Sequence, residues 1–289
     1  WIDLTKDGLD EKLLLRKDGT SGYMTQDLGT ACLRHDDFGS ERLVYVVGNE
    51  QNYHFAVLKL VLEKLGMEWA KDLYHLSYGM VELPNGKMKS REGTVVDADD
   101  LIAQMIETAK TQTEEHGKTE GFTSEQASEL YSQLALGALK YFILKVDPKK
   151  NMLFNPEESI DFNGNTGPFI QYTHARIRSI IRKSENFDSM KMPSSDEKVE
   201  FNSKEKEVLN CLFSFPSVVR QAGETYSPSL IANFAFDLAK NFNAFYQDTP
   251  ILRENDETKR NMRLRLSYFT GATIKTAMHL LGIDVPERM

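Results

Sequence analysis

The stretch that decides the fold is residues 43–66, which read LVYVVGNEQNYHFAVLKLVLEKLG. It begins with a continuous apolar and β-branched run, residues 43–47, which is typical of a buried parallel strand. Apolar residues then recur at helical spacing over residues 55–65, and Gly66 favours the end of the helix. Because residues 73–81 form a second strand candidate, the pattern predicts a strand–helix–strand unit and therefore an α/β sheet.

The segments on either side of this unit extend the prediction. Residues 1–24 read as a short β-meander, and residues 25–34 have helical character. A polar segment with glycine at both ends, residues 86–93, is typical of a loop, and Asp97 is placed to cap a helix that runs to about residue 116. The first part of the chain is therefore expected to be an α/β domain.

From residue 124 onward the pattern changes to long amphipathic helices. They are expected at residues 125–146, 166–184, 203–222, 228–247 and 258–281. A polar and charged tract between two of them, residues 184–202, reads as a loop. The second domain is therefore predicted to be an all-α helical bundle. The domains are expected to be residues 1–123 and 124–289.

Length and composition agree with two globular domains. The chain has 289 residues. A domain has roughly 150 residues on average, so this length suits two domains. No apolar run approaches the roughly 18 residues that a membrane span needs, so we expect a soluble, cytoplasmic protein that does not bind membranes. The two cysteines, Cys32 and Cys211, lack metal-ligand spacing. They indicate a reducing compartment and no metal site.

The net charge of −8 disfavours a nucleic-acid partner when the chain is taken as a whole. Residues 1–124 contain 14 Lys and Arg against 22 Asp and Glu, whereas residues 125–289 contain 21 of each. The whole acidic excess therefore belongs to the first part. The second part is neutral and can present a basic face that is balanced by acidic residues elsewhere.

Two segments of the predicted α/β domain carry polar side chains suited to a ligand. Tyr23 and Asp27 lie four residues apart at the entry to a helix, and residues 48–54 follow the buried strand. Ligands of open α/β sheets bind beyond the carboxyl ends of the strands, where a glycine such as Gly48 lets a nucleotide approach the backbone. A polar strand-to-helix turn with capping residues explains the same pattern, and residue types alone favour that alternative.

The loop after the second strand offers three cations, Lys87, Lys89 and Arg91, within five residues. A cationic loop that folds over a polyphosphate would stabilise the charge that develops on pyrophosphate as it leaves. A solvated hairpin tip is the alternative, and it is the commoner role of an isolated basic turn. The sequence contains no Walker-type loop and no convincing acyl-transfer triad.

The helix expected at residues 166–184 combines aromatic and basic side chains. Gln171, His174 and Arg178 share one face, and Tyr172 and Arg176 share another. Aromatic rings beside arginines can stack unpaired bases and hold phosphates, as proteins do with single-stranded RNA loops. An exposed basic face with Tyr172 at its edge explains the pattern equally well.

A second aromatic group lies in the helix expected at residues 228–247. Phe242, Phe245 and Tyr246 recur at helical spacing, so most of the group is expected to lie in the core. Tyr246 stands at the end of the run and is the member expected to be exposed.

Taken together, these segments resemble the C-terminal part of class I arginyl-tRNA synthetases over essentially the whole chain. The motifs that carry the resemblance are, in order, YMTQD at 23–27, VVG at 46–48 with Gln51 and His54-Phe55, KMKSR at 87–91, GNTGP at 164–168 with Gln171-Tyr172, and GIDVPERM at 282–289. The last two are very specific to this family. The resemblance implies part of a Rossmann-like catalytic α/β domain, followed by an all-α helical-bundle domain that binds the anticodon.

The resemblance also implies a two-step reaction. Arginine and ATP give arginyl-adenylate and pyrophosphate, and the arginyl group then passes to the terminal adenosine of tRNA(Arg). The matching site residues are Tyr23, Asp27 and Gln51 for arginine; Gly48, His54 and Met88 for ATP; Lys87, Lys89 and Arg91 for catalysis; and Tyr172, Arg176, Tyr246 and Met289 for the anticodon. A carboxylate such as that of Asp27 suits a guanidinium, because the two groups pair in bidentate fashion. Magnesium is expected to arrive on the ATP, and the protein is expected to be a monomer.

Two departures from the family pattern limit these expectations. The usual signature is KMSKS, and its second lysine falls at Ser90, so Lys87 is the better-supported contact for pyrophosphate. The family's HIGH motif and the first half of the nucleotide fold are absent from the sequence. The chain is therefore expected to be a C-terminal fragment that does not activate arginine alone. The alternatives are a non-catalytic RNA-binding paralogue and, less favoured, another class I enzyme such as the cysteinyl one.

Overall fold

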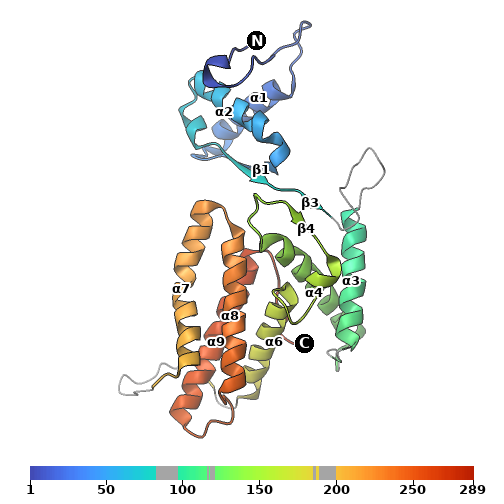
Figure 1. Cartoon of the computed structure of the whole chain (residues 1–289), viewed down its shortest axis with the longest axis vertical. Helices are drawn as coiled ribbons and strands as arrows, with labels where there is room; N and C mark the ends of the chain where they lie inside the picture. Colours follow the sequence, from blue (N-terminus) through green and yellow to red (C-terminus); the bar gives the residue numbers. More distant parts are fainter. Residues whose placement is uncertain (83–96, 116, 118–120, 185–186, 189–199) are drawn as a thin grey trace. The chain divides into compact units, whose positions relative to one another are not determined.

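The computed structural model describes the chain in two compact units (Figure 1). Unit 1 comprises Trp1–Met80 with Lys149–Asn151, and unit 2 comprises Val81–Pro148 with Met152–Met289. The residues that the structure describes are 1–82, 97–115, 117, 121–184, 187–188 and 200–289. The predicted cationic loop at residues 87–91 lies outside these residues.

Unit 1 is built around the strand–helix–strand stretch that the sequence predicts. Its elements are η1 (Thr5–Asp7), α1 (Tyr23–Phe38), β1 (Val44–Gly48), η2 (Asn49–Gln51), α2 (Asn52–Lys64), η3 (Glu68–Asp72) and β2 (Tyr74–Tyr78). The strands β1 and β2 pair in parallel, with Val44 opposite Tyr74 and Gly48 opposite Tyr78. The predicted β–α–β unit is therefore confirmed.

The apolar face of α2 forms the core of unit 1. Phe55, Leu58 and Leu62 are buried, as the helical spacing predicts, whereas Leu65 lies just beyond the end of α2 and is exposed. Gly66 follows with a φ of 83°, a left-handed conformation that ends the helix at little steric cost for glycine. The helix therefore ends where the sequence predicts. Leu65, which the spacing assigns to the apolar face, is not in the core.

The predicted β-meander of residues 1–24 is wrong in detail. The described backbone there makes two isolated antiparallel bridges, Ile2 with Lys12 and Leu15 with Ser21, instead of continuous strands. Leu13 and Leu15 are exposed, whereas Leu4 is buried and Ile2, Leu9 and Leu14 pack against the core of unit 1. The segment therefore packs apolar side chains without extending its two bridges into a ladder.

The second predicted strand, residues 73–81, is divided in the structure. β2 ends at Tyr78, and β3 (Val81–Glu82) pairs in parallel with β4 (Met152–Leu153) in a separate two-stranded sheet. Gly79 lies between them, and a Cβ at this position would approach the backbone of Lys150 to 2.3 Å. The close approach of these two segments explains why a glycine interrupts the apolar run.

Unit 2 is helical apart from the short β3–β4 sheet. Its helices are α3 (Ala98–Glu115), α4 (Ser124–Leu144), α5 (Pro156–Ser159), α6 (Gly167–Lys183), α7 (Ser203–Thr225), α8 (Pro228–Asp248) and α9 (Glu257–Leu280). The five long helices expected after residue 124 are all present, and Asp97 accepts a hydrogen bond from the amide of Asp99 at the start of α3. Because α3 packs on α4 within unit 2, the domain boundary predicted at residue 123 stays a prediction.

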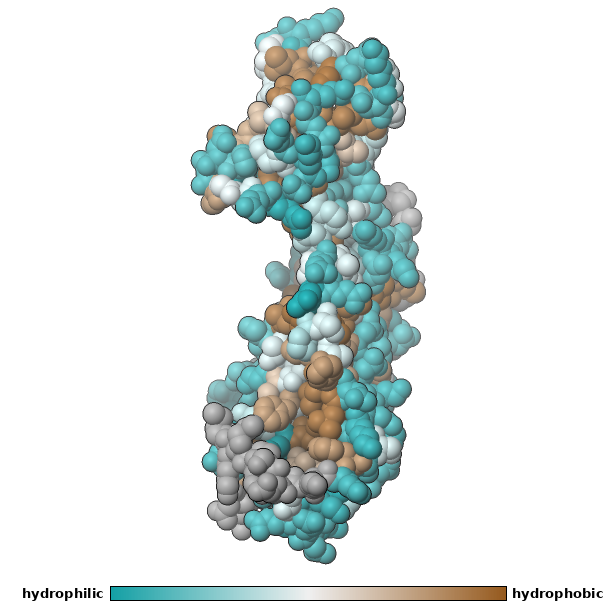
Figure 2. Space-filling model, turned by 90° about the vertical axis from the view of Figure 1, so that its left-hand side faces the viewer, coloured by the Kyte–Doolittle hydropathy of each residue, from teal (hydrophilic) through white to brown (hydrophobic). Residues whose placement is uncertain are grey.

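Two apolar clusters stabilise unit 2. The larger one lies between α6, α7, α8 and α9, and the smaller one joins α3 and α4 to the segment around Phe154 and Phe162. Figure 2 shows a further apolar patch on the surface of this unit, and α7 leaves Phe213 89% exposed. None of the described helices is both long enough and apolar enough to span a membrane.

Candidate functional site

Polar residues gather where β1 ends in unit 1. Gly48 is the last residue of β1, Gln51 ends η2, and His54 lies in the first turn of α2. A Cβ at Gly48 would meet only the ring of Tyr78, at 3.6 Å. The segment from 48 to 54 therefore lies beyond the carboxyl end of the strand, where open α/β sheets bind ligands.

Asp27 and His54 form the contact that joins α1 to this segment. The Oδ2 atom of Asp27 lies 2.6 Å from Nε2 of His54, and the Asp27 side chain keeps 48% of its surface exposed. Tyr23, one turn before Asp27, is 83% exposed, and Gln51 is also exposed. The structure thus brings Asp27 and His54 together, and it leaves both Tyr23 and the carboxylate accessible to a solute.

The remaining residues predicted for the chemistry of the first domain, Lys87, Met88, Lys89 and Arg91, lie outside the described residues. Within the part of the chain that the structure describes, no group of three or more His, Cys, Asp or Glu side chains is arranged to hold a metal ion.

In unit 2, the motif at residues 164–168 builds the start of α6. The Thr166 hydroxyl caps the helix by accepting a hydrogen bond from the amide of Phe169. Asn165 accepts a hydrogen bond of 2.6 Å from the hydroxyl of Tyr141 on α4. A Cβ at Gly167 would lie 2.4 Å from the carbonyl oxygen of Gly137, so only glycine permits this approach of α6 to α4. The motif therefore fixes the position of α6.

One face of α6 holds the C-terminal segment. Gln171 donates to the carbonyl oxygen of Asp284 at 2.8 Å, and Nδ1 of His174 donates to that of Pro286 at 2.9 Å. Further along the helix, Arg182 donates to the carbonyl oxygen of Glu287 at 2.8 Å. Gln171 and His174 are buried, so this face of α6 is covered by the protein's own C-terminal segment, whereas the face with Tyr172 and Arg176 is not.

Glu287 is the charged anchor of this segment. Its carboxylate accepts from Arg178 at 2.5 Å and from Lys275 at 3.0 Å. Burial alone would raise the pKa of Glu287, but the hydrogen bonds from Lys275 and Arg178 outweigh it and lower the pKa. Burial lowers the pKa of His174, against the hydrogen bond to Pro286 and the charge of Glu287, which raise it. Burial therefore favours the neutral form of the imidazole that holds the segment.

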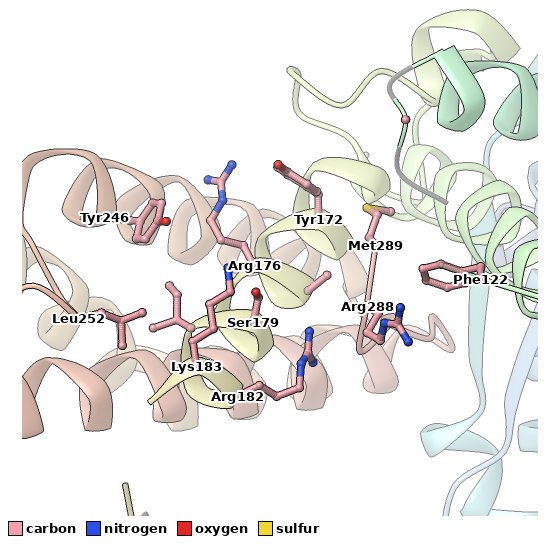
Figure 3. Close-up of a pocket in the computed structure, with 13 residues that line it drawn as sticks. Phe122, Tyr172, Arg176, Ser179, Arg182, Lys183, Tyr246, Leu252, Arg288 and Met289 are labelled. Carbon is pink, nitrogen blue, oxygen red and sulfur yellow. The ribbon is translucent and has the colours of Figure 1, made fainter. Parts of the chain in front are cut away.

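The other face of α6 lines a pocket of about 480 Å³ (Figure 3). The four residues predicted to meet the anticodon, Tyr172, Arg176, Tyr246 and Met289, all line it. Tyr246 is 40% exposed, whereas Phe242 and Phe245 are fully buried, as the sequence predicts. Residues from α6, from α8 and from the C-terminal segment therefore meet at one place.

Arg176 lies between the two tyrosines in Figure 3. Its guanidinium carbon is 4.7 Å from the ring centroid of Tyr172 and 5.4 Å from that of Tyr246. Both distances are in the range of cation–π contacts. Arg176 also donates a hydrogen bond to Asn243 of α8.

The sequence analysis missed several residues of this pocket. They are Phe122, Ser179, Arg182, Lys183, Leu252 and Arg288. Ser179 and Lys183 continue the helical spacing of Tyr172 and Arg176, so periodicity could have found them. With Arg176, Arg182, Lys183 and Arg288 the described lining includes four cationic side chains and no Asp or Glu side chain, which favours a positive potential in the pocket although the chain is acidic.

Comparison with known families divides the chain in two. Residues 2–155 match the family described as "tRNA synthetases class I (R), catalytic domain". Residues 170–289 match the family described as "DALR anticodon binding domain". The second match contains most of α6, all of α8 and the C-terminal segment, and therefore most of the pocket's lining.

Individual relatives agree with these matches. The chain is 60% identical over its whole length to an arginine–tRNA ligase of Phocaeicola vulgatus and 57% identical to one of Bacteroides thetaiotaomicron, and it spans about half the length (48%) of each. Its structure resembles that of an arginyl-tRNA synthetase from Thermus thermophilus, with a TM-score of 0.85 and 26% identity over 96% of this chain and 51% of that one. The arginyl-tRNA synthetase of Plasmodium falciparum gives a TM-score of 0.80 and 25% identity, over 96% of this chain and 46% of that one. The chain belongs to the class I arginyl-tRNA synthetase family, and it joins part of the family's catalytic domain to a DALR anticodon-binding domain.

Proposed function

We propose that this chain is part of an arginine–tRNA ligase, in which unit 2 binds the anticodon of tRNA(Arg). The observation that carries the proposal is the pocket lined by Tyr172, Arg176, Tyr246 and Met289. It offers two aromatic rings for stacking bases and cations for phosphates, which are the groups that single-stranded RNA loops require. A volume of about 480 Å³ suits an unstacked nucleotide.

In unit 1, we propose that Tyr23, Asp27 and Gln51 recognise the arginine substrate. The half-exposed carboxylate of Asp27 can pair with a guanidinium in bidentate fashion, while its contact with His54 fixes the side chain. Gly48 and His54, at the end of β1, would border ATP. ATP would bring its magnesium ion on the phosphate oxygens.

In the proposed reaction, ATP activates the arginine carboxylate and the arginyl group then passes to tRNA(Arg). Lys87, Lys89 and Arg91 are proposed to stabilise the departing pyrophosphate, and Met88 to border ATP, on the strength of the family motif that they match. The reaction would take place in the cytoplasm, with the protein acting as a monomer.

The proposal for unit 2 is tested by titrating the chain with a fluorescently labelled anticodon stem–loop of tRNA(Arg). We expect the logarithm of the binding constant to fall linearly with the logarithm of the salt concentration, because cations of the pocket contact phosphates. The matched control is the same stem–loop with its anticodon bases exchanged, which should bind more weakly. Equal affinity for both stem–loops, or no binding to either, would refute anticodon recognition.

A further inference from the structure

The side chain of Asn243 occupies the second layer of the pocket, behind Arg176. Its Oδ1 atom accepts a hydrogen bond from Nη1 of Arg176, and its Nδ2 atom donates to Oγ1 of Thr173 at 2.8 Å. Asn243 does not itself line the pocket. Its hydrogen bond to Arg176 links it to the pocket.

The orientation of the Asn243 amide follows from hydrogen-bond chemistry. The Thr173 hydroxyl donates to the carbonyl oxygen of Phe169 at 2.9 Å, so its oxygen is left to accept. An acceptor on this side requires that the Nδ2 atom of Asn243 faces Thr173. The Oδ1 atom then has to face Arg176, which carries only donors.

We propose that Asn243 is a positioning residue for RNA recognition, which holds the Arg176 guanidinium between the rings of Tyr172 and Tyr246 before RNA binds. The inference rests on the proposed function of the pocket. An arginine side chain that is free to rotate loses rotamer freedom when it binds a ligand. An arginine that Asn243 already holds loses less, and it keeps its remaining N–H groups for phosphate oxygens or base edges.

The test is a double-mutant cycle with the labelled tRNA(Arg) anticodon stem–loop. Asn243→Ala should weaken binding roughly 2- to 10-fold, since ordering one long side chain accounts for an effect of that size. In an Arg176→Ala background the same substitution should have no further effect, because the side chain that Asn243 holds is gone. A residue with a merely structural role would weaken binding in both backgrounds.

The matched control is Asn233→Ala on the same helix. Asn233 donates to the carbonyl oxygens of Ser229 and Lys145, at 2.7 and 3.2 Å, and it does not line the pocket. Its substitution should leave RNA affinity unchanged. Alanine favours helix more than asparagine does, so both variants should fold. Asn243→Ser, which is equally too short to reach Arg176, replaces the alanine variant if that one does not fold.

The outcomes separate the inference from the function on which it rests. A wild-type chain that does not bind the stem–loop overturns both. A wild-type chain that binds, together with an Asn243→Ala variant of equal affinity, overturns only the role of Asn243. If Asn243→Ala lowers RNA affinity equally in the wild-type and Arg176→Ala backgrounds, the role of Asn243 is overturned as well.

Discussion

Nδ1 of His174 donates a hydrogen bond of 2.9 Å to the carbonyl oxygen of Pro286, so the middle of α6 holds the segment that ends at Met289. His174 is buried, and the residues that follow Pro286 deliver Arg288 and Met289 to the pocket. The segment and the pocket thus depend on two different faces of one helix, and Arg182 contributes to both.

The buried imidazole makes the stability of the chain depend on pH. Burial lowers the pKa of His174 below its ordinary value of 6.5, so the unfolded state binds the proton more readily than the folded state. The contribution of His174 is fully present above pH 6.5 and is lost as the pH falls from there toward the folded-state pKa. We expect the free energy of unfolding, measured with urea, to fall over this window.

His174→Asn should remove this part of the pH dependence, because the asparagine amide can donate to Pro286 but does not titrate. The matched control is His279→Asn at an exposed position of α9, which should leave the pH dependence as it is in the wild type. An unchanged slope in His174→Asn would show that other groups cause the pH dependence.

Gly167 is expected to tolerate no side chain. A Cβ there would lie 2.4 Å from the carbonyl oxygen of Gly137, and backbone cannot yield as a flexible side chain does. Gly167→Ala should therefore lower the free energy of unfolding by at least about 1–3 kcal/mol, the usual cost of overpacking. The measurement is urea denaturation.

The control for Gly167 lies on α7. A Cβ at Gly223 would meet no atom within 4 Å. Gly223→Ala should therefore raise stability by about 0.5–1 kcal/mol, because alanine is the better helix former. Equal effects of the two substitutions would contradict the close approach of α4 and α6.

The outcome at particular residues shows what the sequence could predict. The helical spacing over residues 55–62 and the cap at Asp97 are local features, and both are confirmed. The hydrogen bond that holds the C-terminal segment joins Gln171 to Asp284 across 113 positions, and no local sequence pattern predicts such a contact. The spacing showed that Gln171 and His174 share a face, but only the packing shows that this face is covered.

The pocket shows the same difference between local patterns, which the sequence predicts, and long-range contacts, which it does not. Tyr172, Arg176, Tyr246 and Met289 were assigned to the anticodon from the resemblance to the family, and the physical reasoning from residue types left their role open. Asn243 was missed, because its partner Arg176 lies 67 positions away and asparagine on a helix gives no signal of its own. Contacts between distant segments depend on how helices pack, which periodicity does not determine.

Asp27 provides a prediction for the proposed arginine site. In the proposed arginine–tRNA ligase, Asp27→Ala should raise the KM for arginine by the equivalent of about 2–5 kcal/mol, because the bound guanidinium loses its counter-charge. The measurement is arginine-dependent ATP–pyrophosphate exchange with tRNA present. The control is Asp10→Ala, which removes another carboxylate that contacts α2, at the hydroxyl of Tyr53. If both variants keep the wild-type KM, Asp27 does not bind the substrate.

Tyr172 and Tyr246 provide the last prediction, because stacking and core packing give opposite results for them. If each ring stacks a base, Tyr172→Ala and Tyr246→Ala should each weaken binding of the tRNA(Arg) stem–loop by about 1–3 kcal/mol. Tyr246→Phe keeps the ring and should retain most of the affinity. Phe269→Ala, which removes a half-exposed ring of α9 outside the pocket, should leave the affinity unchanged. Affinity is measured by fluorescence anisotropy and stability by the melting temperature. Alanine variants that lose thermal stability but keep their RNA affinity would show that the rings serve the fold and not the RNA.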